Sequence, residues 1–181
     1  MQWCSETEEA INNMSNDRLS LQTWKEQNDM MLLQLTMHVR SNLTDLQRNI
    51  IVALITVDVH ARDIVDEMRA ESVLTVYDFN WQKQLRYYWD NEAEGNEGAV
   101  MIKQIQAVLN YGKEYMGACS RLVITPLTDR CWITISGALH IKLGANPAGP
   151  AGTGKTESTK DLAKAIATLC IVFNCSDQVN Y

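Results

Sequence analysis

The chain has 181 residues, of which 46% are hydrophobic and 21% are charged. This composition is typical of a globular protein and argues against a disordered chain. The formal net charge is −6, and no basic stripe occurs in the sequence. Because affinity for a phosphodiester backbone requires clustered Lys and Arg, nucleic-acid binding is excluded as a leading function.

Negative charge is concentrated in the first part of the sequence. Residues 1–98 contain 8 basic and 17 acidic residues, whereas residues 99–181 contain 8 basic and 5 acidic residues. This asymmetry predicts two regions with different roles. An acidic, solvated helical surface beside an ordinary domain would give the same distribution.

The cysteines and the N-terminal residues bear on the compartment. The five cysteines are scattered, with no CxxC pair and no His at metal-ligand spacing, which is typical of reduced thiols inside a cell. The first residues lack a secretory signal, and no stretch of about 18 apolar residues occurs. We therefore expect a soluble protein without a membrane partner.

The spacing of apolar residues predicts helices in the first region. One helical run includes Met30 to Val39, and the clearest helix spans about Asp45 to Arg69. Apolar residues recur in that helix at intervals of three and four, which places them on one face; they are Ile50, Leu54, Val57, Ala61, Ile64, Val65 and Met68. His60 lies off this stripe, so we expect it at the surface or at its boundary.

The middle of the chain is less regular. Ser72–Tyr77 is short and β-rich, and Asp78 is placed to cap a helix whose aromatic and apolar stripe, Trp81, Leu85, Tyr88 and Trp89, would be core. Residues 90–98 are polar and contain glycine, which predicts a loop. Helix and strand patterns fit residues 99–111 equally well.

The last third changes in character. Arg121–Thr125 is a short apolar run ended by Pro126, and Thr128 with Asp129 can cap a helix through Leu139. A loop rich in Gly and Pro begins at Gly144. A helix from about Lys155 would follow, with Leu162, Ala163, Ile166 and Leu169 on its inner face, and then a strand buried on both faces at Cys170–Cys175. This order is typical of an α/β nucleotide-binding unit.

One motif carries a specific chemistry. The pattern G-x-x-x-x-G-K-[ST] is matched by Gly149, Pro150, Ala151, Gly152, Thr153, Gly154, Lys155 and Thr156. Glycines let backbone N–H groups turn inward around phosphate oxygens, and a helix N-terminus adds to the same anion site. Lys155 would reach the β- and γ-phosphates, and the Thr156 hydroxyl would ligate Mg²⁺. The alternative is a glycine-rich turn that only caps a helix.

Four motifs follow one another in the last third of the chain: Arg121–Cys131, Gly149–Thr156, Thr159–Lys164 and Val172–Asp177. Together they resemble the start of the first AAA+ module of dynein heavy chains. Two upstream motifs, Val57–Asp63 and Gln84–Trp89, resemble the C-terminal part of the dynein linker, the lever across the motor ring. The resemblance is close from Asp45 to Tyr181 and looser before it.

This resemblance implies a mixed fold. A mainly α-helical part of the linker would occupy residues 1–115, followed by an incomplete α/β P-loop (AAA+) domain at 116–181. The implied ligands are ATP and Mg²⁺, with Leu122, Val123, Ile124 and Pro126 packed against adenine. In the complete protein the implied partners are microtubules and intermediate or light chains. The implied location is the cytoplasm and cytoskeleton. Because the sequence is more similar to axonemal than to cytoplasmic dyneins, the resemblance implies the axoneme of a cilium.

The sequence departs from the family pattern in several places. Ala145 and Asn146 alter the residues before the loop, Ser158 stands where Thr is common, and Gln178 and Asn180 replace Gly and Asp. The sequence also lacks the acidic Walker B pair, the sensors and an arginine finger, so we expect little or no ATP hydrolysis by this polypeptide alone. The alternative function is a truncated, non-motor product that acts as a binding or regulatory remnant.

Overall fold

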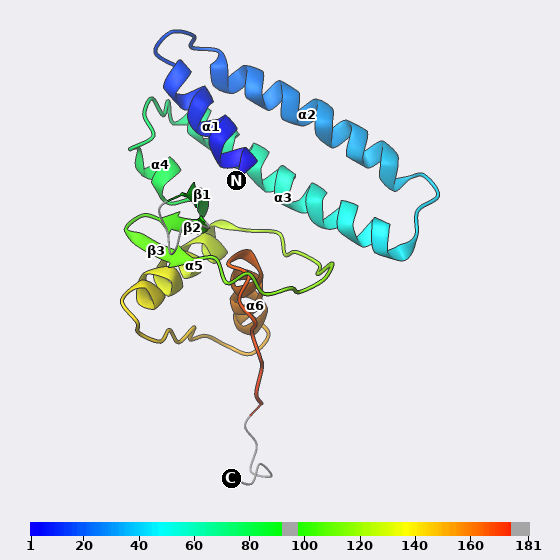
Figure 1. The fold of residues 1–181 in the computed structure, drawn as a ribbon, viewed down its shortest axis with the longest axis vertical. Coiled ribbons are helices and arrows are strands. Elements are labelled where there is room, and N and C mark those ends of the chain that lie inside the picture. Colours follow the sequence, from blue (N-terminus) through cyan, green and yellow to red (C-terminus); the bar gives the residue numbers. More distant parts are fainter. Residues whose placement is uncertain (92–97, 175–181) are drawn as a thin grey trace.

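The computed structural model describes residues 1–91 and 98–174. A hairpin of long helices projects from a more compact part that contains a small sheet and shorter helices (Figure 1). The elements, in chain order, are α1 (Gln2–Asn13), α2 (Ser20–Val39), α3 (Asp45–Ala70), α4 (Phe79–Gln82), β1 (Arg86–Asp90), β2 (Ala99–Gln104), β3 (Ala107–Asn110), α5 (Pro126–His140) and α6 (Lys155–Ala165). The predicted mixed fold class is confirmed.

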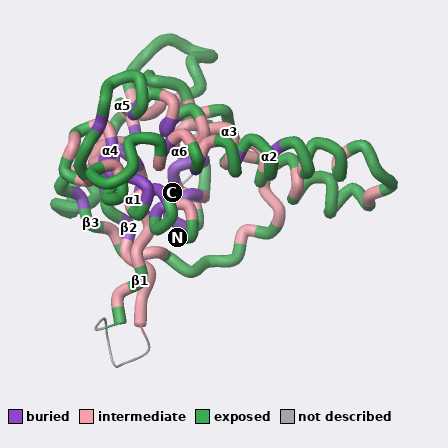
Figure 2. Tube along the Cα trace, turned by 90° about the horizontal axis from the view of Figure 1, so that it is seen from above, coloured by how far each residue is buried: buried purple, intermediate pink, exposed green. Residues whose placement is uncertain are grey.

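Helix α3 begins and ends close to the predicted positions. Thr44 forms a capping box with Gln47, in which the Thr44 side chain accepts from the Gln47 N–H and the Gln47 side chain accepts from the Thr44 N–H. The C-terminal half of its apolar stripe is buried. The N-terminal half is not, because Ile50, Leu54 and Val57 keep 43–49% of their surface exposed. Figure 2 shows this outer part of the hairpin as mostly exposed or intermediate.

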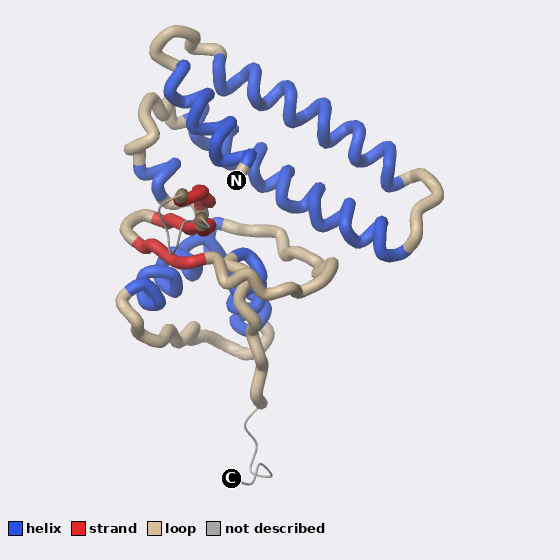
Figure 3. Tube along the Cα trace, viewed as in Figure 1, coloured by secondary structure: helices blue, strands red, loops and turns tan. Residues whose placement is uncertain are grey.

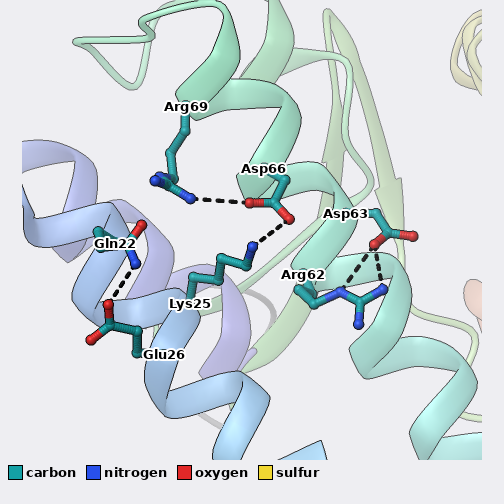
Figure 4. Close-up of polar contacts among 7 residues, drawn as sticks. All are labelled: Gln22, Lys25, Glu26, Arg62, Asp63, Asp66 and Arg69. Carbon is teal, nitrogen blue, oxygen red and sulfur yellow. Dashed lines mark hydrogen bonds and ion pairs between the residues drawn. The ribbon is translucent and has the colours of Figure 1, made fainter.

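Polar contacts reinforce the α2–α3 hairpin (Figure 4). Lys25 Nζ of α2 lies 2.8 Å from Asp66 Oδ2 of α3, and Arg69 Nη1 lies 3.1 Å from the other carboxylate oxygen. These pairs are partly exposed, so each contributes about 0–1 kcal/mol. Burial of apolar side chains therefore supplies most of the stabilisation of the hairpin.

Two hydrophobic cores organise the chain. The first joins α1, α2, α3 and α4, and its buried members are Cys4, Ala10, Ile11, Leu21, Trp24, Ala61, Ile64, Val65, Met68, Val73 and Trp81. The second joins the sheet to α5 and α6 through Ile102, Trp132, Ile135, Leu162, Ala165 and Ile166. Tyr87 of β1 packs against both cores. The second core draws residues from both sides of position 115, and the boundary there stays a prediction.

The structure corrects the expectation for residues 72–90. Residues 72–78 form turns rather than a strand, and α4 is a single turn. In a longer helix the Gln82 carbonyl would accept from Arg86, but it accepts instead from the Ile105 N–H at 2.7 Å. The chain then enters β1. Trp81 is fully buried, as expected of core, whereas Trp89 is 53% exposed.

The sheet resolves the ambiguity of residues 99–111 in favour of strands. Its order is β1-β2-β3, antiparallel throughout, with Tyr87 opposite Ile102 and Ile102 opposite Leu109. Burial alternates at the end of β2, where Ile102 and Gln104 are buried and Lys103 is exposed. Of the predicted loop at 90–98, residues 92–97 lie outside the described residues.

Helix α5 begins earlier than predicted. Thr125, not Thr128, is its cap, and Pro126 occupies the first turn, where its missing N–H costs nothing. Thr128 takes part as the third helical residue, and its hydroxyl accepts from the Thr125 N–H at 2.6 Å. The helix ends at His140, one residue beyond the predicted Leu139.

The predicted strand at Cys170–Cys175 is wrong for its described residues. Residues 170–174 have no regular secondary structure, and Ile171 and Phe173 are 70% and 82% exposed. A strand buried on both faces needs paired neighbours, and the sheet contains only β1, β2 and β3 among the described residues. Cys175 lies outside them. Cys4, Cys119, Cys131 and Cys170 are free cysteines.

None of the helices within residues 1–91 and 98–174 is long and apolar enough to span a membrane.

Candidate nucleotide-binding site

The glycine-rich loop leads directly into α6. Two glycines of the loop adopt the left-handed backbone conformation, which is unfavourable for other residues. The φ angle is 77° at Gly152 and 80° at Gly154. Gly154 is the N-cap residue of α6, which begins at Lys155. The unpaired N–H groups of the first helical turn and the helix dipole therefore lie at the end of this loop. This geometry suits an anion, as the sequence motif predicts.

Lys155 lies against the loop that precedes it. Its Nζ donates to the Gly149 carbonyl at 2.8 Å, to the Thr153 hydroxyl at 3.3 Å, and to the Pro150 carbonyl. The Thr153 hydroxyl also donates to the Pro150 carbonyl, at 2.9 Å. The ammonium thus lies among the same residues that the motif assigns to the phosphates.

Exposure of the loop residues fits an accessible site. Gly149, Pro150, Ala151, Gly152, Thr153, Gly154 and Thr156 are exposed, and Lys155 is half-buried. The Thr156 hydroxyl is one oxygen ligand of the kind that Mg²⁺ accepts beside phosphate oxygens and water. Among the described residues, no group of three His, Cys, Asp or Glu side chains is placed to hold a metal ion.

The segment predicted to contact adenine lies beside the same helix. Ile124 packs against the second core, whereas Leu122 and Val123 are 39% and 78% exposed. Pro126 is the first residue of α5 and is exposed. Residues 122–125 have no regular secondary structure and lie in the long loop that precedes α5 (Figure 3).

Helix α6 is connected to its surroundings by several hydrogen bonds. Trp132 Nε1 of α5 donates to the Ser158 carbonyl at 3.1 Å, and Lys164 Nζ donates to the Ser120 carbonyl at 3.0 Å. The carbonyls of Ile166 and Ala167, just after the helix, accept from Gly112 and Glu114. These contacts end the helix at Ala165, which leaves the predicted inner residue Leu169 61% exposed.

A cavity of about 170 Å³ separates α3 from the segment 121–124. Its lining includes Asp58, His60, Arg121, Ile124 and Asp129, and no residue of the loop 149–156. Burial lowers the pKa of His60, and the nearby Arg121 lowers it further against the opposite effects of Asp63 and Glu67. Burial raises the pKa of Asp58 and of Asp129. His60 is partly buried and lies at the boundary between the surface and the interior, as the sequence predicts.

Asp161 is a site residue that the sequence pattern does not reveal. It is 1% exposed and contacts the segment at Arg121 and Leu122. In the sequence it reads as one charged residue among several between Glu157 and Lys164, a pattern typical of a solvated helix face. Its adjacency to Leu162 on the buried side of α6 is the one signal available before the fold is known.

Comparison with known proteins agrees with these features. Residues 111–181 match a family described as the hydrolytic ATP binding site of the dynein motor region. Dynein axonemal heavy chain 6 of Homo sapiens is 51% identical over 180 residues, which is 99% of this chain and 4% of that protein. Dynein axonemal heavy chain 1 of Mus musculus is 48% identical over 181 residues, 99% of this chain and 4% of that protein.

A third relative comes from another organism. The dynein-1-beta heavy chain of the flagellar inner arm I1 complex of Chlamydomonas reinhardtii is 46% identical over 179 residues, again 99% of this chain and 4% of that protein. The glycine-rich loop and α6 match the loop and helix of a P-loop motif. The similarity over its whole length identifies it as a segment of the dynein heavy-chain family, and it spans about 4% of the length of these relatives.

Proposed function

We propose that Gly149–Thr156 binds the phosphates of ATP and that Leu122, Val123, Ile124 and Pro126 meet the adenine. The observation that carries this proposal is the left-handed Gly154 at the start of α6, with Lys155 Nζ held over the loop. The N-terminus of α6 and the Lys155 ammonium therefore lie at the same loop, and both favour an anion. The family that matches residues 111–181 supports the choice of ATP.

The proposed site would hold Mg²⁺ with the nucleotide. Thr156 is the second residue of α6 and is exposed, so its hydroxyl oxygen can coordinate the ion beside the phosphates. The ion would neutralise phosphate charge when bound. In this chain Lys155 orients the β- and γ-phosphates, and the first turn of α6 donates N–H groups to them.

In the complete heavy chain, we infer that this site contributes to a microtubule motor. Nucleotide binding and hydrolysis at residues 116–181 would be coupled to movement of the linker, to which residues 1–115 would belong. The shared packing of Tyr87 against both cores supports such a connection. The axonemal and flagellar names of the relatives support a cilium axoneme as the location. Intermediate and light chains are the proposed partners, as the resemblance to dynein heavy chains implies.

The test is equilibrium binding of ATP to a heavy-chain polypeptide that contains this segment and the remainder of its ATP-binding module. Lys155→Ala removes a charge-assisted contact, and we expect affinity to fall about 10- to 100-fold. Thr156→Ala should weaken binding in the presence of Mg²⁺ and have little effect without it. Lys160→Ala is the matched control, because Lys160 lies in the same helix and pairs with the exposed Glu157. Equal affinity of the wild type and Lys155→Ala would overturn the proposal.

A further inference from the structure

Asp161 joins the helix of the phosphate-binding loop to the proposed adenine segment. Its Oδ1 accepts a hydrogen bond from the Leu122 N–H at 3.3 Å and lies 3.3 Å from Arg121 Nε. One carboxylate oxygen thus contacts two consecutive residues of the segment. Asp161 is the only acidic residue of α6 that is buried, since Glu157 is exposed.

The burial of this carboxylate is energetically unusual. Asp161 is 1% exposed, and its Oδ2 has no hydrogen-bond partner among the described residues. A buried charge with unused acceptor positions is costly, and an apolar residue of similar size often gives equal or greater stability. Stability alone therefore does not account for a carboxylate at this position. A buried, paired carboxylate can instead serve to fix local geometry.

A second contact fixes the same segment to the same helix. Lys164 Nζ, one turn after Asp161, donates to the Ser120 carbonyl at 3.0 Å. The segment that begins at Ser120 is thus held by α6 at two points. Because α6 also begins at Gly154, one rigid helix relates this segment to the phosphate-binding loop. Lys155 and Asp161 are six positions apart in α6, which is about 9 Å along the helix axis.

We propose that Asp161 is a positioning residue for adenine nucleotides, which holds Leu122–Ile124 at a set distance from the loop 149–156. This inference rests on the proposed function of that loop. The carboxylate does not contact the nucleotide itself. It orients the backbone of the adenine segment, while Lys155 and the start of α6 bind the phosphates. Loss of Asp161 should therefore weaken recognition of the base and leave recognition of the phosphates intact.

Two ligands separate these effects: ATP, and inorganic tripolyphosphate, which has the phosphate chain without the base. Affinities are measured on the same heavy-chain polypeptide by titration calorimetry. For Asp161→Ala we expect affinity for ATP to fall about tenfold and affinity for tripolyphosphate to change by less than about twofold. Asp161→Asn keeps an oxygen that can accept a hydrogen bond from the Leu122 N–H, so its affinity for ATP should fall less than that of Asp161→Ala.

Controls distinguish this inference from the proposed function. Asp63→Ala removes a carboxylate that pairs with Arg62 at an exposed position of α3, and it should change neither affinity. Lys155→Ala should weaken both ligands. If Lys155→Ala weakens neither, the phosphate site itself is wrong. If it weakens both while Asp161→Ala weakens the two ligands equally or not at all, only the positioning role is overturned.

Folding of the variants is checked by circular dichroism during thermal unfolding. If Asp161→Ala loses its cooperative transition, Asp161→Leu decides the question, because it removes both oxygens and leaves no cavity. A selective loss for ATP in that variant supports positioning, and an unchanged ratio of the two affinities overturns it.

Discussion

The Tyr87 hydroxyl in β1 donates a hydrogen bond to the Ala165 carbonyl at the end of α6, at an O···O distance of 3.1 Å. The backbone N–H of the same tyrosine donates to Cys4 Sγ of α1 at 3.3 Å. One residue therefore contacts both the N-terminal helical region and the helix that follows the glycine-rich loop. Burial raises the pKa of this tyrosine, so its hydroxyl stays protonated as a donor at neutral pH.

Tyr87→Phe removes this hydrogen bond and keeps the ring in both cores. We expect the free energy of unfolding to fall by about 0.5–1.5 kcal/mol, the usual net value of one such bond. Urea unfolding followed by fluorescence measures the change. Tyr77→Phe is the control, because Tyr77 is 85% exposed. Equal effects of the two substitutions would show that the Tyr87 hydroxyl contributes nothing.

Ser136→Ala tests the contact between α5 and the sheet. The Ser136 hydroxyl donates to Gln104 Oε1 at 2.6 Å, and both residues are buried. Without the hydroxyl, Gln104 keeps a buried oxygen that has lost its donor, which costs about 1–3 kcal/mol. Thermal or urea unfolding gives the value. Thr134→Ala, on the exposed side of the same helix, should have a smaller effect, and the reverse order would contradict the packing described.

The glycines of the loop are expected to differ in their tolerance of alanine. Gly154 has a φ of 80°, so Gly154→Ala places an L-residue in the left-handed region at a cost of about 1–2 kcal/mol. Gly149 has no positive φ, and a Cβ there would meet Thr153 Oγ1 at 3.4 Å, an ordinary contact. Gly149→Ala should change stability by less than about 0.5 kcal/mol. Equal destabilisation by both substitutions would refute this loop conformation.

The lowered pKa of His60 predicts a dependence of stability on pH. Below its ordinary pKa of 6.5 the unfolded chain binds a proton at this residue more readily than the folded chain does. The His60 contribution to stability is therefore complete above that pKa and is lost as the pH falls towards the folded-state pKa. The raised pKa values of Asp58 and Asp129 act in the opposite direction, because their contribution falls as the pH rises above 3.8.

Comparison of variants isolates the histidine. The stability of the wild type relative to His60→Gln should decrease between about pH 7.5 and pH 5.5. Unfolding in urea at each pH gives the difference. His38→Gln is the control, because His38 is exposed on α2. A difference between wild type and His60→Gln that stays constant over this range would contradict burial of the imidazole.

Features set by local sequence are those that the sequence predicts well. The bounds of α3 follow from a long apolar repeat, and the start of α6 follows from the glycine motif. The residues of the proposed phosphate-binding loop are also local in sequence, and their role stays a prediction. Each of these features depends on neighbours within a few turns, so no knowledge of the fold is needed.

Features that depend on contacts between distant parts of the chain cannot be predicted from the sequence. Helix α4 ends at Gln82 because the Gln82 carbonyl accepts a hydrogen bond from the Ile105 N–H. Helix α6 ends at Ala165 because the residues after it form backbone hydrogen bonds with residues 112–114. Asp161 is recognisable only when Leu122 is seen beside it. The sequence predicts a strand at Cys170–Cys175 from apolar composition, but composition shows what a segment could bury and not whether a partner strand is present.

Amide hydrogen exchange tests the central claim most directly, because it reports on the backbone N–H groups that the phosphates would engage. It is measured by mass spectrometry on the heavy-chain polypeptide with and without ATP. The proposed site predicts slower exchange at Gly152–Thr156 when ATP is bound, with smaller changes at the outer end of α2. Unchanged exchange across Gly149–Thr156 at a saturating concentration of ATP would contradict phosphate binding by this loop.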